Sequence, residues 1–365
     1  MHVKSIQLAA FRNYDSLSID LNSNINIFIG DNAQGKTNIL ESIYITAFGK
    51  SYRTSRDKEL IQWNQDKAYI NIDVGRERLD KKIEIKIFKD GKKAIRINSI
   101  KINKISELIG ICNVVMFSPE DLKIVKESPS TRRRFLDMEL CQIDKLYYHN
   151  LVSYNKALSQ RNSILKEYKV DVSMLEVYDL QLAKYGEYII KKRIEYIDKL
   201  NFYGKSIHQD ITSEKETIHF KYLTQIKEFT KVRENLYNML DNSKTRDMER
   251  HITSVGPHRD DFTISINGVD TKSFGSQGQQ RTAVLTMKFS SLKIIKEVLG
   301  EYPILLLDDV LSELDFKRKK YILSSIKDVQ TIITCTGIDD IKNYFSDAAN
   351  VFYVNNGNVT LEKEE

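Results

Sequence analysis

The fold of this chain is decided by Gly30-Asp31-Asn32-Ala33-Gln34-Gly35-Lys36-Thr37. An apolar run, Ile25 to Ile29, precedes this loop, and apolar residues at helical spacing, from Ile39 to Ala47, follow it. Strand, glycine-bounded loop and helix in this order are typical of a phosphate-binding loop, where backbone N–H groups and a helix N-terminus surround the phosphates. The spacing predicts that Lys36 contacts the β/γ-phosphate oxygens and that the Thr37 hydroxyl binds Mg²⁺. An ordinary glycine-rich turn would not require this spacing between these flanks.

Length and composition favour a cytoplasmic protein of more than one lobe. The 365 residues exceed what one core usually holds. The first residues form an alternating strand pattern, and no apolar run reaches the ~18 residues that span a bilayer, so neither secretion nor a membrane partner is expected. Cys112, Cys141 and Cys335 lack metal-ligand spacing and are expected to be reduced thiols. The net charge of +6 permits a polyanionic partner without requiring one.

Three stretches differ in their patterning. Residues 1–128 are largely strands, with a hairpin expected where Ile83–Ile87 and Ile95–Ile97 flank a polar turn. Residues 129–248 form the second stretch, and from about 130 to 245 they have helical spacing without proline, which predicts short antiparallel helices of at most ~45 Å each at 1.5 Å per residue. In residues 249–365, strand patterns and helix patterns alternate along the chain.

In that last stretch, strands are expected at 262–266, 304–307 and 331–334, with helices at 279–298 and 317–327. The pattern predicts an α/β fold, a split mixed core with an inserted helical lobe.

The apolar strand Ile304–Leu307 ends in two carboxylates, Asp308 and Asp309. A buried parallel strand delivers such residues to its C-terminal edge, where ligands of α/β sheets bind. Asp308 is therefore the expected Mg²⁺ ligand, and Asp309 could orient the attacking water. A strand that merely ends in a polar cap is the alternative for this pattern taken alone.

A second polar segment, Ser276-Gln277-Gly278-Gln279-Gln280, directly precedes a predicted helix. The N-terminal end of that helix would suit a phosphate. Another polar turn, Leu311 to Asp315, follows the acidic pair. In order, these segments resemble the phosphate loop, signature, acidic strand and Ser-x-Leu-Asp turn of the ATP-binding-cassette ATPases. In that superfamily two heads enclose two ATP molecules, so the resemblance implies that Ser276 and Gly278 act on ATP held by a second copy, with Gln279 beside them.

The spacing separates the branches of that superfamily. Transporter cassettes carry the signature much sooner after the phosphate loop, and the condensin-like heads insert a very long coiled coil, for which residues 130–245 show no sustained heptads. The chain resembles the RecF family of bacterial recombination mediators almost from end to end. The resemblance rests on residues 11–14, 50–54, 117–122, 132–137, 160–162 and 256–261.

This resemblance implies ATP and Mg²⁺ as cofactors, an ATP-dependent homodimer, slow hydrolysis, and binding to double-stranded and gapped DNA. It also implies cooperation with a RecR-type mediator protein in loading RecA during recombinational repair. By the same resemblance Arg12 and Asn13, after the first strand, contact the nucleotide. The runner-up is a transporter-type or metabolic ATPase without a DNA role, and a third reading is a clamp that binds ATP without useful hydrolysis.

Some positions depart from the superfamily pattern. Asp309 stands where transporters have Glu, which predicts slow hydrolysis because the shorter side chain holds water less well. Thr336 lies where a switch His is usual and is expected only to sense the γ-phosphate. Ala33 replaces a common Gly, which predicts an ordinary φ there. Ser118-Pro119-Glu120 is expected in place of the usual Gln of the Mg²⁺-contacting loop.

Three charged clusters have both a structural and a functional interpretation. The run Arg132-Arg133-Arg134 could contact a phosphate backbone, although a salt-bridged helix face is more common. The run Lys317-Arg318-Lys319-Lys320 would most simply be a solvated helix face. His258 has no second ligand residue at metal spacing, so a structural hydrogen-bond cluster is expected there.

Overall fold

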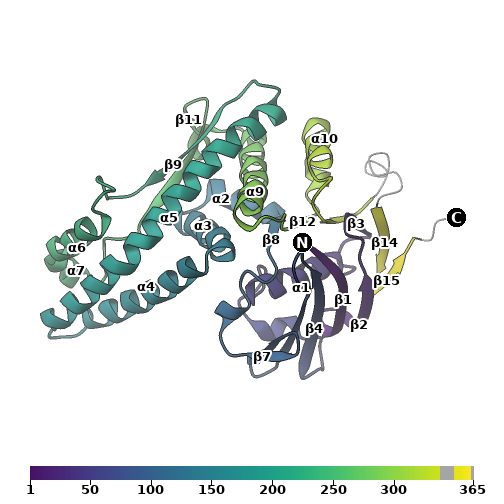
Figure 1. Cartoon of the computed structure of the whole chain (residues 1–365), viewed down its shortest axis with the longest axis horizontal. Helices are drawn as coiled ribbons and strands as arrows, with labels where there is room; N and C mark the ends of the chain where they lie inside the picture. The colour runs from purple at the N-terminus through teal and green to yellow at the C-terminus, as the bar shows by residue number, and fades with distance from the viewer. Residues whose placement is uncertain (338–348, 363–365) are drawn as a thin grey trace. The chain divides into compact units, whose positions relative to one another are not determined.

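The computed structural model describes residues 1–337 and 349–362 and divides the chain into two compact units (Figure 1). The head unit comprises Met1–Asp121 and Ser291–Glu365, and the lobe unit comprises Leu122–Ser290. The division expected from the sequence placed residues 122–128 and 249–290 with the two parts of the head, so the two divisions differ there. Residues 338–348 and 363–365, within the expected C-terminal part, lie outside the described residues.

The head unit contains an antiparallel sheet of six strands in the order β2-β1-β4-β5-β6-β7. Its inward side chains alternate along each strand, as in β5, where Ile83, Ile85 and Ile87 are buried. The hairpin expected around residue 90 is confirmed, because β5 pairs with β6 in antiparallel register. The strands are β1 (His2–Phe11), β2 (Tyr14–Asp20), β4 (Lys67–Gly75), β5 (Lys81–Phe88), β6 (Lys93–Ile97) and β7 (Ile100–Ile102).

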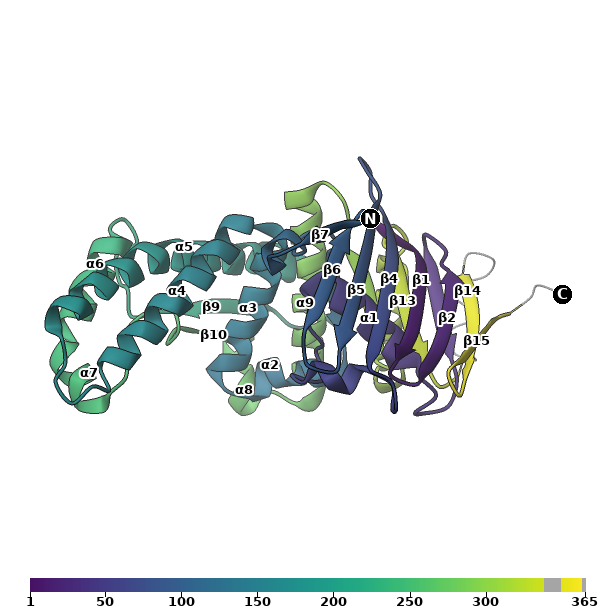
Figure 2. The same ribbon diagram turned by 90° about the horizontal axis from the view of Figure 1, so that it is seen from below.

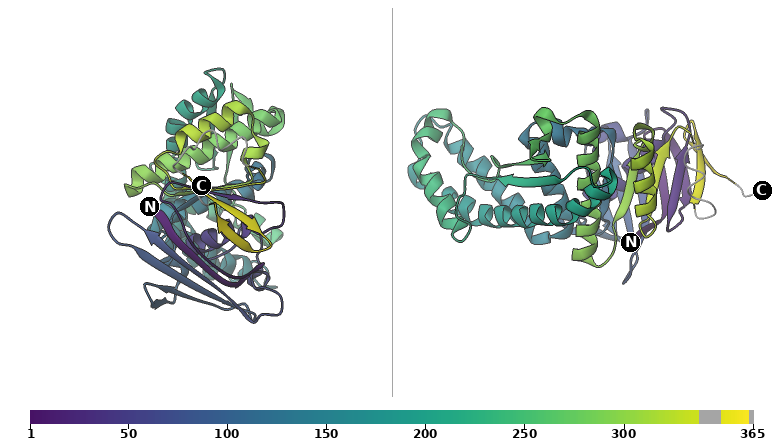
Figure 3. Two further views of the ribbon diagram at one scale, coloured as in Figure 1. Left: turned by 90° about the vertical axis from the view of Figure 1, so that its right-hand side faces the viewer. Right: turned by 90° about the horizontal axis from the view of Figure 1, so that it is seen from above.

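The second sheet of the head unit has the order β15-β14-β3-β13-β12-β8. All neighbours are parallel except β14 and β15, which form a hairpin drawn in yellow in Figure 3. The central strands are apolar and buried along their whole length, as parallel strands covered on both faces must be. The strands are β3 (Ile25–Ile29), β8 (Val114–Phe117), β12 (Ile304–Asp308), β13 (Thr331–Cys335), β14 (Ala349–Asn355) and β15 (Asn358–Leu361).

Helix α1 (Lys36–Phe48) lies between the two sheets and contacts strands of both (Figure 2). Residues on nearly every face of this helix are buried, including the polar Glu41, Ser42 and Thr46. The serine and threonine hydroxyls donate to backbone carbonyls within the helix, which satisfies them without water. The helix that follows the phosphate loop is therefore held on two sides.

The lobe unit is built on a hairpin of α4 (Lys145–Ile164) and α5 (Val172–Thr212) (Figure 1). The sequence-based limit on helix length was wrong, because α5 has 41 residues and is about 62 Å long. Within the stretch expected to be helical, apolar residues recur at helical spacing from Phe135 to Leu151, but the structure divides this segment into α3 (Pro129–Ile143) and α4. Asp144 leaves the helical conformation at φ −137° and caps α4 by accepting from the Tyr147 amide.

Buried charge holds the hairpin together. The Arg161 side chain is fully buried and donates to Asp179 of α5 at 2.6 Å and to Asp247 at 2.8 Å. Arg193 of α5 donates to Asp137 and to the Pro257 carbonyl. Because a buried guanidinium is stable only with its acceptors in place, these bonds fix α5 against its neighbours.

The lobe unit also contains a three-stranded sheet in the order β11-β10-β9. Strand β9 (Ile218–Leu223) lies inside the stretch expected to be wholly helical, and that expectation was wrong. It pairs in antiparallel register with β10 (Asp261–Ile266), which was expected. The strand follows from alternating burial of Ile218 and Phe220, a pattern too short to stand out between long helices.

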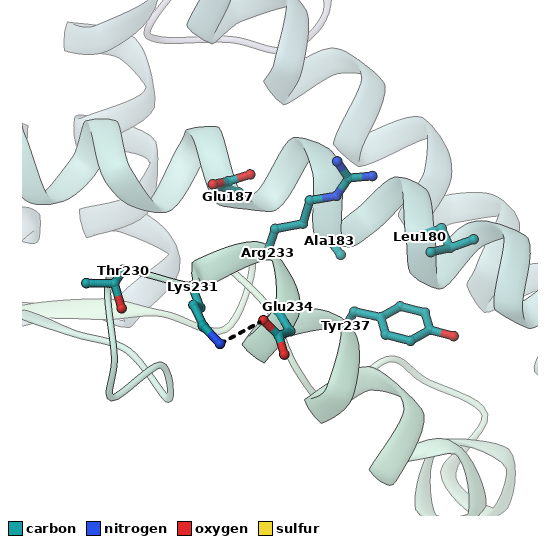
Figure 4. A pocket seen from close by; sticks show the side chains of 8 residues that line it. All are labelled: Leu180, Ala183, Glu187, Thr230, Lys231, Arg233, Glu234 and Tyr237. Atoms are coloured by element: carbon teal, nitrogen blue, oxygen red, sulfur yellow. Dashed lines mark ion pairs between the residues drawn. The ribbon is translucent and has the colours of Figure 1, made fainter.

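A groove of about 420 Å³ lies between α5 and α6 (Val232–Asn242) in the lobe unit (Figure 4). Leu180 and Tyr237 line it beside charged Glu187 and Arg233. It contains none of the residues expected at the nucleotide.

The other helices are short, apart from α9 (Gln277–Leu299). All three cysteines are free and buried, as expected for thiols. No helix in the described ranges is both long and apolar enough to cross a membrane. The remaining elements are η1 (Asp57–Leu60), η2 (Ile105–Glu107), η3 (Pro119–Asp121), α2 (Leu122–Lys126), α7 (Lys244–Arg250), β11 (Val269–Asp270), α8 (Thr271–Phe274), α9 (Gln277–Leu299), η4 (Leu311–Glu313) and α10 (Phe316–Ser325).

Candidate nucleotide site

Four neighbouring parallel strands of the head unit end at one edge of the sheet. The register pairs Ile29 with Cys335, Thr334 with Asp308, and Leu307 with Phe117. The residues that follow are consequently neighbours too: the phosphate loop after β3, Thr336 after β13, Asp309 after β12 and Ser118 after β8. This is the edge where a parallel α/β sheet binds ligands. The parallel register brings together residues that are far apart in the sequence.

The phosphate loop curls tightly before α1. Lys36 is 6% exposed, and its Nζ donates to the carbonyls of Gly30 at 2.6 Å and Asp31 at 2.8 Å. The expectation for Ala33 was wrong, since its φ is +67°. A loop that points successive N–H groups at one anion alternates between right- and left-handed conformations, and Ala33 takes the left-handed one despite its Cβ.

The loop is supported by residues distant in sequence. Asn13 Nδ2 donates to the Gln34 carbonyl at 2.9 Å, and Tyr14 donates to the Gly35 carbonyl at 3.1 Å. Gly35 has φ +121°, and a Cβ there would lie 2.6 Å from Asn13 Nδ2, so glycine is required. The backbone N–H of Asn356, in the β14–β15 turn, donates to Gln34 Oε1 at 2.6 Å.

Asp308 is the centre of a hydrogen-bond cluster at the end of β12 and is 7% exposed. Its Oδ1 accepts from Thr37 at 2.9 Å and from Thr334 at 3.0 Å, while its Oδ2 accepts from the Tyr52 hydroxyl at 3.0 Å. Burial, followed by the Asp308 charge, raises the pKa of Tyr52 far above its usual range, so the phenol stays a donor. Thr37 and Asp308 were predicted from their motifs, whereas Tyr52 and Thr334 were not, although Tyr52 belongs to one of the family-like stretches.

The positions expected near the γ-phosphate differ in how they are held. Asp309 has φ +53°, its N–H donates to Thr334 Oγ1 at 3.0 Å, and its carbonyl accepts from Ser312. Thr336 is exposed directly after β13. Ser118 is fixed by its own N–H, which donates to Asp121 Oδ2 at 2.7 Å. Their roles toward a nucleotide stay predictions.

Arg12, expected at the nucleotide, is fixed by a buried carboxylate. Its Nε and Nη2 donate to Glu41 of α1 at 2.8 and 2.7 Å, and its Nη1 donates to the Glu59 carbonyl. Glu41 is fully buried and also accepts from Ser51 and Arg53. Glu41 was not predicted from the sequence, because an acidic residue on a predicted helix face normally faces solvent.

The residues present fit a magnesium nucleotide. Within residues 1–337 and 349–362 no group of three or more His, Cys, Asp or Glu could hold a metal by itself. Mg²⁺ in nucleotide sites needs one or two protein oxygens and takes the rest from phosphates and water. Thr37 and Asp308, which meet at 2.9 Å, supply such a pair beside the loop.

The signature residues lie in the lobe unit, at the start of α9. The exposed Ser276 and the half-buried Gln279 form reciprocal bonds: Ser276 N–H donates to Gln279 Oε1 at 2.9 Å, and Gln279 N–H donates to Ser276 Oγ at 3.2 Å. This capping box leaves Gly278 in the first turn, among the N–H groups of the helix start. An anion at this helix start would meet donors and no carboxylate within the motif.

Several side chains of the charged clusters are held by neighbours within the chain. Arg132 is 5% exposed and forms a bidentate pair with Asp261, whereas Arg134 is exposed. Arg318 pairs with Asp315 at the start of α10. His258 bonds to the Tyr154 hydroxyl and the Thr253 carbonyl, so the hydrogen-bond cluster expected there is confirmed. Burial lowers the pKa of His258 to about 4.

Comparison with known proteins agrees with this geometry. Residues 2–360 match the model of the RecF/RecN/SMC N-terminal domain. The DNA replication and repair protein RecF of Clostridium botulinum (strain Alaska E43 / Type E3) is 63% identical over 98% of this chain and 99% of its own.

Two solved structures are similar to this chain in fold. The recombination mediator protein RecF-ATP of the RecFOR pathway is 39% identical, with a TM-score of 0.90 over 99% of this chain and 98% of that one. An Smc head domain of Pyrococcus furiosus, 16% identical, shares the fold with a TM-score of 0.58 over 99% of this chain and 96% of that one. The chain therefore belongs to the RecF family of DNA replication and repair proteins, with the ATPase head fold of the wider RecF/RecN/SMC family.

Proposed function

We propose that this protein is an ATP-dependent DNA-binding switch of recombinational repair and replication-gap processing. ATP drives two copies together on double-stranded or gapped DNA, the dimer helps a RecR-type partner load RecA, and slow hydrolysis resets it. The observation that carries the proposal is the Thr37–Asp308 bond at the edge where the phosphate loop also ends. The family relationship supports the repair role, and the similarity to the solved structure of RecF-ATP supports ATP as the nucleotide.

The chemistry requires little of the protein beyond position and charge. Lys36 would exchange its two carbonyl acceptors for β/γ-phosphate oxygens, and Thr37 and Asp308 would hold Mg²⁺, which neutralises phosphate charge when bound. Asp309 would orient the attacking water, and Ser276 of a second copy would contact the γ-phosphate. We propose slow turnover because Asp309 is short and its backbone is already committed to Thr334.

The deciding experiment measures molar mass by light scattering with ATP, with ADP and without nucleotide, each with and without a gapped duplex. We expect dimers with ATP but not with ADP or without nucleotide. We expect DNA to be retained only by the ATP-bound dimer. A transporter-type or metabolic ATPase would hydrolyse ATP with no response to DNA. A protein that stays monomeric with ATP and DNA would contradict the switch.

A further inference from the structure

The first turn of α9 is held from outside the signature by Glu216, which lies in the loop between α5 and β9. Gln279 Nε2 donates to Glu216 Oε1 at 2.8 Å. The second carboxylate oxygen, Oε2, lies 3.5 Å from Nε2 of His208, a fully buried histidine of α5. One acidic side chain therefore lies between the signature and the end of the long helix, all within the lobe unit.

This contact fixes which way the Gln279 amide faces. Its Oε1 accepts from the Ser276 N–H at 2.9 Å, so its NH₂ group must point to an acceptor, and Glu216 supplies that acceptor. A reversed amide would place NH₂ against the Ser276 donor. Glu216 thus selects the amide orientation that completes the capping box and sets the Ser276 backbone.

The buried His208 beside Glu216 is itself held against α9. The Thr286 hydroxyl donates to the Thr282 carbonyl at 2.8 Å, so its contact with His208 Nδ1 at 3.0 Å needs the proton on that nitrogen. The ring is thereby fixed against α9. Helices α5 and α9 approach closely here, since a Cβ on Gly204 would lie 3.4 Å from Thr286 Cγ2.

We infer that Glu216 is a positioning residue for the signature: it orients Gln279 so that Ser276 is presented in one conformation to a nucleotide on a second copy. The inference rests on the proposed function for its consequence, but the positioning itself is a property of a single chain without nucleotide. Because Glu216 follows the last residue of α5 by four positions, the seating of that helix on α9 and the geometry of the signature are linked.

The test compares Glu216→Ala with Glu216→Gln, whose Oε1 still accepts from Gln279. A matched control is Asp210→Ala, which removes an exposed carboxylate at the end of α5. Without nucleotide, amide exchange at Ser276, followed by NMR, should be about fivefold faster in Glu216→Ala, as expected for loss of a helix cap. Glu216→Gln and Asp210→Ala should match the parent. Half-maximal dimerisation of Glu216→Ala should need more ATP, with monomeric ATP affinity unchanged.

Two outcomes would overturn the inference. Unchanged exchange at Ser276 in Glu216→Ala would mean that Glu216 does not position the signature. Faster exchange along the whole of α9 would mean general support of the helix instead. If exchange behaves as expected but the parent never dimerises with ATP, the proposed function fails while the positioning role stands.

Discussion

Thr37 and Asp308 are 271 residues apart in the sequence, yet the Thr37 hydroxyl donates to Asp308 Oδ1 at 2.9 Å. The threonine lies in the first turn of α1, which is held between two sheets, and the aspartate ends a fully buried strand. The pair is set before any nucleotide binds, so substitutions around it should change chemistry more than folding.

Lys36→Arg tests the phosphate loop. The variant keeps the charge but replaces a compact ammonium with a planar fork, which does not fit a site where Nζ lies 2.6 Å from the Gly30 carbonyl. Hydrolysis should fall by orders of magnitude, nucleotide binding should weaken less, and the thermal midpoint should stay close to that of the parent. Turnover at the parent rate would show that the site is assigned wrongly.

Tyr52→Phe tests the cluster around Asp308. It removes only the hydroxyl that donates to Oδ2 at 3.0 Å. Substitution of a residue that orients a metal ligand commonly lowers metal affinity about 10–100-fold. The Mg²⁺ concentration needed for half-maximal hydrolysis should therefore rise by about tenfold. ATP binding in EDTA should be unchanged. Tyr69→Phe, which loses a similar bond to Glu84 on the other sheet, is the matched control and should behave like the parent.

Ser276→Arg and Asp309→Asn should move the dimer in opposite directions. Ser276 is exposed, so arginine fits the monomer, but its bulk and charge would occupy the seam with a second copy. Monomeric ATP binding should persist while ATP-driven dimerisation is lost. Asparagine tolerates the φ of +53° at position 309 and removes the carboxylate proposed to orient water, so the dimer should last longer. A Ser276→Arg protein that dimerises like the parent rules out the arrangement.

DNA binding should require ATP and weaken steeply with salt, because phosphate contacts release counterions. The net charge of +6 is modest, so we expect a loss of roughly tenfold or more between about 50 and 200 mM salt. Sequence preference should be slight. Fluorescence anisotropy at several salt concentrations gives the slope, and tight binding without nucleotide would contradict the gating.

His258 and Asp260 should make opposite contributions to acid stability. Burial lowers the pKa of His258 from 6.5 to about 4, so the unfolded state binds the extra proton and stability falls as pH falls through this window. Burial raises the pKa of Asp260 from 3.8 to about 6, so its contribution falls as pH rises. Relative to the parent, His258→Gln should lose stability less on acidification from pH 6.5 to 4.5, and Asp260→Asn more. Urea unfolding at three pH values measures both, and equal slopes in all three proteins would refute the assignment.

The elements with a strong local signal could be predicted from the sequence. Strand β12, strand β13 and helix α9 lie where their apolar spacing places them, because buried strands and long helices leave patterns that neighbours do not disturb. Strand β9 could not be predicted, since it is defined by pairing with β10 about forty residues later rather than by its own residues. The length of α5 was underestimated because its polar residues include buried Arg193, which looks like a solvent-facing position in the sequence.

The same distinction applies to the site. Gly30 to Thr37 and Asp308 belong to motifs with fixed spacing, so residue type and position together predict their roles. Tyr52, Thr334 and Glu41 act through contacts that only the folded chain creates, and a tyrosine or glutamate at those positions has no distinguishing local pattern. Ala33 shows the remaining limit, because loop geometry overrides the preference of the residue.

The parallel sheet has a consequence for biosynthesis. The Val3 N–H donates to Gln330 Oε1, 327 residues further on, and β3 lies between two strands that come after Gln330 in the chain. A ribosome adding about 5–20 residues per second needs roughly a quarter of a minute to a minute to supply them. During that interval the apolar β3 has no partner on either side, so the nascent chain should be a client of chaperones, and chains released early should aggregate rather than bind nucleotide.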